Sequence, residues 1–187
     1  NFINLERAEN GAASLYVAEY ELASYLQNTI HSFHSLAEMK HINLTYKSNF
    51  KFLNTWIDKE KMDSILKNVI SNALKYTPEG KDVHIISTET DNAWSIEVKD
   101  NGIGIPILEQ KSIFKAHFRG SNVINTQTAG SGIGLLLVWK LVQLHKGKIA
   151  FNSTENEGTY FKITFPKNEA HYKEATHTTK QENEQVV

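Results

Sequence analysis

An amphipathic helix is the feature of this sequence that most restricts its fold. From residue 62 onward, apolar residues recur at the three- and four-residue spacing of one helix face. This stripe comprises Met62, Ile65, Leu66, Val69, Ile70, Ala73 and Leu74. Asp58 precedes the run as a candidate N-cap, and the sequence TPEG ends it after Tyr76. The pattern predicts a helix over residues 59–76 whose apolar stripe belongs to the core.

Polar residues gather along one edge of this stripe. At helical spacing Asn68, Asn72 and Lys75 fall together, with Tyr76 between them and the core side. A single amide there is usually the solvated border of an amphipathic helix. Two amides and an ammonium group become a candidate phosphate or metal site only if other parts of the chain support it.

Composition limits the class of protein. The length of 187 residues fits one domain, or one domain with tails. The 20 basic and 21 acidic residues give a net charge of −1, which does not favour a nucleic-acid or anionic-membrane partner. The absence of cysteine excludes disulfides and thiolate chemistry and fits a reducing compartment. No apolar run has the length of a membrane span.

The remaining periodicity predicts an α/β domain. Apolar residues at helical spacing indicate further helices, and alternating apolar and polar residues indicate strands. We predict helices over 22–40 and 134–147, and strands over 42–46, 83–88, 94–98, 148–153 and 159–165, with a loop-rich stretch over 100–130. About three helices then cover one mixed or antiparallel sheet. Residues 1–16 resemble the end of a helix and a connector, and residues 167–187 are a polar tail or linker.

Two glycine-rich segments provide the support that the helix edge requires. The segments are DNGIGIP at 100–106 and GSGIGL at 130–135, and the second leads directly into a buried helix. Glycine lets backbone approach a ligand closely, and a helix N-terminus favours an anion. Neither segment fits the Rossmann or P-loop spacing. The chain has no acidic residue from 110 to 154, whereas it has Lys111, Lys115, Arg119, Lys140, Lys146 and Lys148 there, a cationic field suited to polyphosphate.

The order of these segments resembles that of a known family. NVISNALKYTPEG, DNGIGIP, IFKAHFRG and GSGIGL are similar to the N, G1, F and G2 boxes of sensor histidine kinases, in that order. The resemblance covers roughly residues 17–166, including NEGTYFKITFP as the closing strand pair. It implies the catalytic, ATP-binding domain of this family, in the GHKL superfamily. That domain has the Bergerat fold, a two-layer α/β sandwich with a mostly antiparallel sheet of about five strands, covered on one face by helices.

The resemblance also implies roles for the polar helix edge. Asn68 and Asn72 match the amides that hold Mg²⁺ and the phosphates, with Asn72 the stronger candidate for direct metal contact. An amide oxygen is a hard, neutral ligand of the kind that Mg²⁺ accepts. Lys75 would contact a phosphate, and Tyr76 would lie against the nucleoside. The pair of amides on the helix edge is therefore explained as part of an ATP site.

The first glycine segment corresponds to the adenine site. Asp100 matches the carboxylate that accepts a hydrogen bond from the adenine amino group, and Thr159 resembles the threonine that joins it. Gly102 and Gly104 would let the base lie close to the backbone, and Ile105 is a further candidate for contact with the nucleotide. Guanine would present a carbonyl oxygen to this carboxylate, so we expect the site to select adenine.

The stretch over 107–129 resembles the mobile ATP lid. Phe114 and Phe118 match the F box, and Arg119 would contact the terminal phosphates. The hinge and phosphate cradle would be formed by Gly130, Gly132 and Gly134, followed by Leu135. We expect low local stability in a segment that must move.

The implied reaction is transfer of the ATP γ-phosphoryl group to histidine. It requires mainly positioning and charge neutralisation, for which Asn68, Lys75 and Arg119 are the candidates. In this family the acceptor lies on a helical dimerisation domain. His31, His34 and His41 lack the acidic residue that follows the acceptor, so we expect the acceptor to lie outside this sequence. Asn68 replaces the glutamate base of gyrase- and Hsp90-type ATPases, which disfavours hydrolysis as the alternative.

The same motifs leave two further functions open and imply a set of partners. One open function is a degenerate nucleotide- or partner-binding module, and the second is a serine kinase of the anti-sigma type, although the boxes favour the histidine kinase. The implied partners are the dimerisation domain and a response regulator or a receiver domain after the tail, as in a hybrid sensor. We expect a cytoplasmic location within a homodimeric, membrane-anchored protein.

Overall fold

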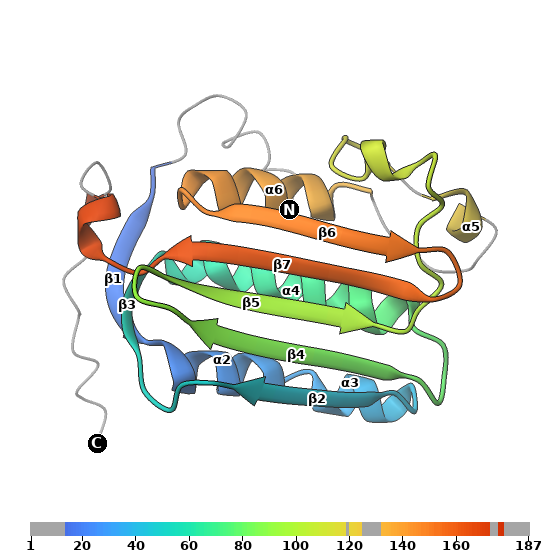
Figure 1. Ribbon diagram of the computed structural model, residues 1–187, viewed down its shortest axis with the longest axis horizontal. Coiled ribbons are helices and arrows are strands. Elements are labelled where there is room, and N and C mark those ends of the chain that lie inside the picture. The colour runs from blue at the N-terminus through green and yellow to red at the C-terminus, as the bar shows by residue number, and fades with distance from the viewer. Residues whose placement is uncertain (1–13, 119, 125–131, 173–175, 178–187) are drawn as a thin grey trace, which may run out of the picture.

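The computed structural model describes residues 14–118, 120–124, 132–172 and 176–177. Its main layer is a five-stranded sheet with the strand order β2-β4-β5-β7-β6 (Figure 1). These strands are β2 (Asn43–Ser48), β4 (Asp82–Glu89), β5 (Ala93–Asp100), β7 (Gly158–Pro166) and β6 (Lys148–Thr154). Strands β2 and β4 are parallel, and every other neighbouring pair is antiparallel. The predicted two-layer sandwich with a mixed, mostly antiparallel sheet is confirmed.

The helices form the second layer, on one face of this sheet (Figure 1). They are α2 (Leu22–His31), α3 (His34–Met39), α4 (Lys59–Tyr76) and α6 (Gly134–Leu144). The prediction of one continuous helix over 22–40 is wrong, because the chain breaks between His31 and His34 into two helices. The other two helices lie where their periodicity placed them.

Alternation along the strands separates the buried face of the sheet from the outer face. On β5 the side chains of Trp94, Ile96 and Val98 are buried, whereas Glu97 and Lys99 lie on the opposite face. An antiparallel sheet can leave one face to solvent, and here that face carries the ion pair between Glu97 and Lys162, at 2.7 Å. The helices therefore cover only the apolar face.

Helix α4 lies in the middle of the covering layer. All seven residues of its predicted apolar stripe are buried. The carboxylate of Asp58 caps the helix by accepting a hydrogen bond from the backbone N–H of Lys61 at 3.1 Å. The predicted N-cap and the end of the helix after Tyr76 are confirmed.

A second, smaller sheet has the order β3-β1-β8, with β1 (Tyr16–Glu21), β3 (Asn54–Ile57) and β8 (Thr176–His177). None of these short strands was predicted. Beside them, the short helix η2 (Glu169–Tyr172) buries Tyr172 against Leu15 and Val17. The expectation that the residues after Pro166 are too polar to join a core is therefore wrong for Tyr172.

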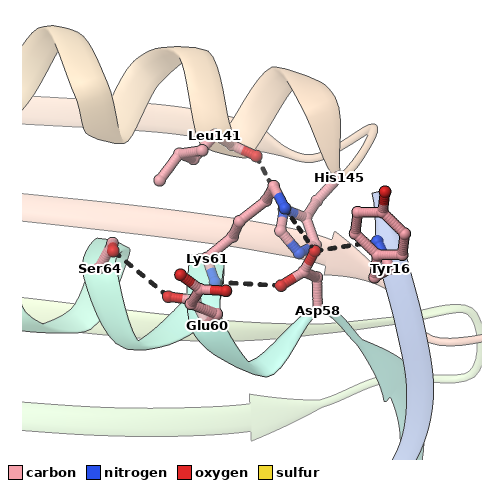
Figure 2. Close-up of polar contacts among 7 residues, drawn as sticks. All are labelled: Tyr16, Asp58, Glu60, Lys61, Ser64, Leu141 and His145. Atoms are coloured by element: carbon pink, nitrogen blue, oxygen red, sulfur yellow. Dashed lines mark hydrogen bonds and ion pairs between the residues drawn. The ribbon is translucent and has the colours of Figure 1, made fainter. Parts of the chain in front are cut away.

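A cluster of polar residues joins β1, the start of α4 and the end of α6 (Figure 2). We call Tyr16, Asp58, Lys61 and His145 the Asp58 cluster. The Asp58 carboxylate accepts hydrogen bonds from the backbone N–H of Tyr16 at 2.9 Å and from Lys61 Nζ at 2.7 Å. Nδ1 of the buried His145 donates to the Leu141 carbonyl at 2.8 Å, and burial lowers the pKa of this imidazole. Asp58, before the start of α4, lies beside His145, just after the end of α6. Asn68, further along α4, lies beside Gly134, the first residue of α6. Helices α4 and α6 therefore run in opposite directions.

None of the helices in the described part of the chain combines the length and the apolarity that crossing a bilayer requires.

Candidate functional site

A cavity of about 300 Å³ lies at the end of α4 and the start of α6, against the ends of β5 and β7. Most of the predicted site residues line it: Asn68, Asn72, Lys75, Tyr76, Asp100, Gly104, Ile105, Gly132, Gly134, Leu135 and Thr159. Gly102 and Phe114 lie outside its lining. Arg119 and Gly130 lie outside the described residues. The structure thus brings together residues that are up to 91 positions apart in the sequence, from Asn68 to Thr159.

Asp100 is placed by the pairing of the strands. It lies opposite Thr159 of β7, which in turn lies opposite Ser153 of β6, so three polar residues interrupt the buried face at this end of the sheet. Oδ1 of Asp100 accepts the backbone N–H groups of Gly102 at 2.9 Å and Thr159 at 3.1 Å. Among the described residues, none donates to Oδ2. This oxygen is left as a hydrogen-bond acceptor for a ligand.

Burial raises the pKa of the Asp100 carboxyl group, while the two backbone hydrogen bonds lower it. The two backbone hydrogen bonds therefore offset only part of the free energy that the ionised carboxylate loses when it is removed from water. A ligand that donates a hydrogen bond to Oδ2 would stabilise the ionised form further.

The loop after Asp100 lies so close to its neighbours that side chains are excluded. Gly104 has φ +62°, and a Cβ there would be 2.0 Å from the carbonyl oxygen of Thr154. A Cβ at Gly102 would be 2.6 Å from the carbonyl oxygen of Tyr76. The backbone N–H of Ile103 donates to that same carbonyl at 3.1 Å. The loop is therefore fixed against the end of α4.

The polar edge of α4 forms the opposite side of the cavity. Nδ2 of Asn68 donates to the carbonyl of Ser64 at 2.8 Å, which fixes the orientation of the amide. Its Oδ1 then lies beside Gly134, where an added Cβ would be 2.6 Å away. The side chain of Asn72 makes no hydrogen bond to any residue that the structure describes, and Lys75 Nζ donates to the hydroxyl of Tyr76 at 3.0 Å. Two amide oxygens are thus available on one side of the cavity.

These oxygens fit a hard divalent cation. Mg²⁺ takes oxygen ligands and usually keeps several waters or phosphate oxygens. Within the described ranges, no group of three or more His, Cys, Asp or Glu side chains could hold a metal ion. The side chains available to an ion at this site are the amides of Asn68 and Asn72, with the remaining positions left to an accompanying anion or water.

The first part of the predicted lid packs on the sheet. Phe114 contacts Phe151 of β6 edge to face, with ring centroids 5.9 Å apart, and so anchors the segment. Phe118 lines the cavity. Asn122, in the short helix α5 (Ser121–Ile124), donates to the carbonyl of Gly104 at 3.0 Å. The lid segment and the glycine loop are thus joined across the cavity.

The described lysines of the basic run do not line the cavity. Lys75 and Asp100 are the charged residues among the described lining residues. Lys140, Lys146 and Lys148 follow the chain away from the cavity, along the second half of α6 and the start of β6. Among the described residues, Lys75 therefore supplies the positive charge of the lining.

Sequence reasoning missed three polar residues of this region, Gln110, Asn122 and Ser153. Gln110, in the short helix η1 (Gln110–Ser112), donates from Nε2 to the carbonyls of Ile105 at 3.0 Å and Ser153 at 2.8 Å. Ser153 could have been found, because alternation along β6 places it on the same face as Ile149 and Phe151. A serine in an otherwise apolar row is a signal of polar contacts.

A family comparison agrees with this geometry. Residues 57–169, more than half of the chain, match the family described as histidine kinase-, DNA gyrase B- and HSP90-like ATPases. The chain belongs to this family. Its members are ATPases by description, which implies nucleotide binding, and the predicted Bergerat fold is confirmed.

Individual relatives are sensor kinases. The chain is 28% identical to histidine kinase P4 of Formosa agariphila over 176 residues, which is 92% of this chain and 13% of that protein. It is 31% identical to the sensor histidine kinase YvrG of Bacillus subtilis over 161 residues, 86% of this chain and 28% of that protein. The chain thus spans less than a third of the length of either relative. The resemblance to histidine kinases is confirmed.

Solved structures show the same fold. The catalytic domain of histidine kinase ThkA matches with a TM-score of 0.73 and 24% identity, over 84% of this chain and 99% of that one. Full-length ShkA, solved in complex with AMPPNP, matches with a TM-score of 0.74 and 23% identity, over 89% of this chain and 35% of that one.

Proposed function

We propose that this chain is the ATP-binding catalytic domain of a sensor histidine kinase, which transfers the γ-phosphoryl group of ATP to a histidine on a dimerisation domain. The observation that supports this most is the division of the cavity into two ends. Asp100 and Thr159 present acceptors at one end, and Asn68, Asn72 and Lys75 present amides and an ammonium group at the other. An adenine base and a metal-bound polyphosphate need these two sets of groups.

Each residue has a role in this proposal. Oδ2 of Asp100 accepts a hydrogen bond from the adenine amino group, Gly104 and Ile105 line the cavity beside the base, and the N–H of Gly102 holds Oδ1 of Asp100. Asn72 and Asn68 hold Mg²⁺, which would neutralise phosphate charge, and Lys75 contacts a phosphate. Tyr76, Phe118 and Leu135 enclose the nucleoside. Arg119 and the glycines from Gly130 to Gly134 act on the terminal phosphates.

Hydrolysis is the alternative reaction, and the chemistry of Asn68 disfavours it. An ATPase needs a base to take a proton from the attacking water, and an amide cannot take one. A degenerate binding module is disfavoured because the polar groups of both ends are present around one cavity. A histidine kinase needs positioning more than a base, which these residues offer.

The proposal includes partners outside this sequence. The acceptor histidine lies on a dimerisation domain of the same protein, to which residues 1–16 lead. A response regulator, or a receiver domain of the same protein, then takes the phosphoryl group. We propose a homodimer anchored in a membrane with this domain, residues 17–166, in the cytoplasm.

Calorimetric titration of the chain with ATP tests the nucleotide site directly. We expect binding that is strengthened by Mg²⁺ and at least about tenfold tighter for ATP than for GTP, because guanine presents an acceptor to Asp100. Equal binding of ATP and GTP would contradict the adenine assignment. Absence of binding to either nucleotide would contradict the proposed function.

A further inference from the structure

The hydroxyl group of Ser153 lies at the centre of the contacts behind the base-binding end of the cavity. Ser153 is buried, with 8% of its surface exposed. Its Oγ accepts the backbone N–H of Ile105 at 2.9 Å, donates to the carbonyl of Gly158 at 3.0 Å and lies 3.0 Å from Oγ1 of Thr159. Through these contacts one side chain of β6 touches the glycine loop, the start of β7 and the side chain of Thr159.

A count of protons fixes the direction of the contact with Thr159. A serine hydroxyl has one proton and two lone pairs. The proton of Ser153 is used in the bond to the Gly158 carbonyl, and one lone pair is used by the N–H of Ile105. Only a lone pair remains for Thr159. The hydroxyl of Thr159 must therefore donate its proton to Ser153, away from the cavity.

This direction decides what Thr159 offers to a ligand. With its proton turned towards Ser153, Oγ1 of Thr159 can only accept. Oδ2 of Asp100 also only accepts while the carboxyl group is ionised. Both Thr159 and Asp100 line the cavity, and their strand positions are directly opposite each other.

We propose that Ser153 is a positioning residue for base selectivity. It holds Thr159 as an obligate acceptor, so that the site presents a pair of acceptors to the 6-position edge of a purine. A 6-amino purine donates there and is favoured, whereas a 6-oxo purine presents an oxygen and is rejected. This inference rests on the proposed function, which places the base at Asp100, and adds a residue that does not touch the base.

Binding of ATP and ITP tests the proposal, because inosine carries the 6-oxo group without the 2-amino group of guanosine. We expect the wild-type chain to prefer ATP over ITP by at least about tenfold, and Ser153→Ala to lower this ratio about five- to tenfold. Without its acceptor, Thr159 can turn its proton towards the cavity and donate to the 6-oxo oxygen. Thr159→Val should lower the ratio similarly, and the double variant should lower it no further, because Ser153 acts through Thr159.

Two controls separate positioning from folding. Thr159→Ser keeps the hydroxyl and should keep most of the selectivity. Ser153→Cys keeps a side chain in the space with a much weaker acceptor, and it should behave as Ser153→Ala does if the alanine variant fails to fold. Circular dichroism and thermal unfolding without nucleotide show which variants retain the native structure.

Each contrary result has a distinct meaning. Equal weakening of ATP and ITP by Ser153→Ala would overturn the proposal, since a general loosening of the loop would act on both. Additive effects of the Ser153 and Thr159 variants on the ratio would also overturn it. A wild-type chain that binds both nucleotides equally overturns this inference, whereas one that binds neither overturns the proposed function itself.

Discussion

Polar groups lie at both of the shared ends of helices α4 and α6, but the two ends differ in how those groups are used. At one end, the carboxylate of Asp58 accepts hydrogen bonds from Tyr16 and Lys61, all within the chain (Figure 2). At the other end, Oδ2 of Asp100 and the amide of Asn72 have no hydrogen-bond partner among the residues that the structure describes. The carboxylate at one end of the helix pair thus has partners within the chain, whereas the carboxylate and amide at the other end keep atoms that are open to a ligand.

The difference separates polar groups that stabilise the fold from groups that bind. A buried charge costs free energy unless it is paired, so the internally bonded Asp58 contributes to stability as long as its partners remain. A buried carboxylate with one unused oxygen keeps part of that cost, which a ligand can relieve. Substitution of Asp58 should therefore lower the free energy of unfolding and leave nucleotide affinity nearly unchanged. Substitution of Asp100 should lower nucleotide affinity without lowering the free energy of unfolding.

The largest effect is expected from removing the carboxylate of Asp58. Asp58→Ala deletes the N-cap of α4 and leaves the ammonium group of Lys61 and the N–H of Tyr16 without their acceptor. We expect the free energy of unfolding to fall by about 3 kcal/mol, measured by denaturant titration. ATP affinity, measured under conditions where the variant is folded, should stay within about twofold of the wild type.

A matched control is the exposed ion pair of Lys59 and Asp63 in the same first turns of α4, at 2.8 Å. Lys59→Ala should cost at most about 0.5 kcal/mol, because solvent screens an exposed pair. If both substitutions cost the same, the Asp58 cluster is not the stabilising end of the comparison.

At the open end, Asp100→Asn should lower nucleotide affinity but not the free energy of unfolding. We expect ATP affinity to fall about 10- to 100-fold, because a hydrogen bond to a charged acceptor is lost and an amide N–H₂ now faces the adenine amino group. Burial raises the pKa of this carboxyl group, so its ionised form opposes folding at neutral pH, and the neutral amide should leave the free energy of unfolding equal or higher. Titration calorimetry and denaturant unfolding measure the two quantities.

Asp82→Asn provides the comparison for this variant. Asp82 lies on the neighbouring strand β4, outside the cavity lining. Its Oδ1 accepts a hydrogen bond from Nδ2 of Asn43 at 2.8 Å. Its substitution should leave ATP affinity unchanged. A similar loss of affinity in both variants would indicate a general effect of charge and would contradict a specific contact at Asp100.

The open end was easier to predict from the sequence than the closed end, and the reason is the range of the contacts. Asn68, Asn72 and Lys75 share one helix, so a single period places them together, and the glycine segments are local signals. The Asp58 cluster joins Tyr16, Asp58 and His145, which are far apart in the chain and carry no common pattern. The strand β1, which supplies Tyr16, is short and pairs only with other short strands, so its alternation is too brief to recognise.

The basic run and the missed Ser153 both show that proximity in sequence differs from proximity in space. The basic residues from 111 to 148 form a run without acidic neighbours, but α6 and β6 carry the later ones away from the cavity. Ser153 was missed for the converse reason, because its contacts to Ile105 and Gln110 cross from β6 to a loop more than forty positions earlier. The apolar row of Ile149 and Phe151 marks Ser153 as a candidate for polar contacts, but the partners of Ser153 depend on strand register, which no local pattern reveals.

The smallest effect is expected at Asn72, and it distinguishes metal contact from base contact within the open end. Asn72→Ala removes an amide that makes no bond to the described residues, so the free energy of unfolding should change by less than about 0.5 kcal/mol. The affinity gained by adding Mg²⁺ to the ATP titration should fall about tenfold, while affinity measured without Mg²⁺ should stay nearly constant. Lys67→Ala, at an exposed position of the same helix, should retain the full Mg²⁺ effect. A full Mg²⁺ effect in Asn72→Ala would place the ion on other groups, and an equal loss with and without Mg²⁺ would make Asn72 a contact of the nucleotide itself.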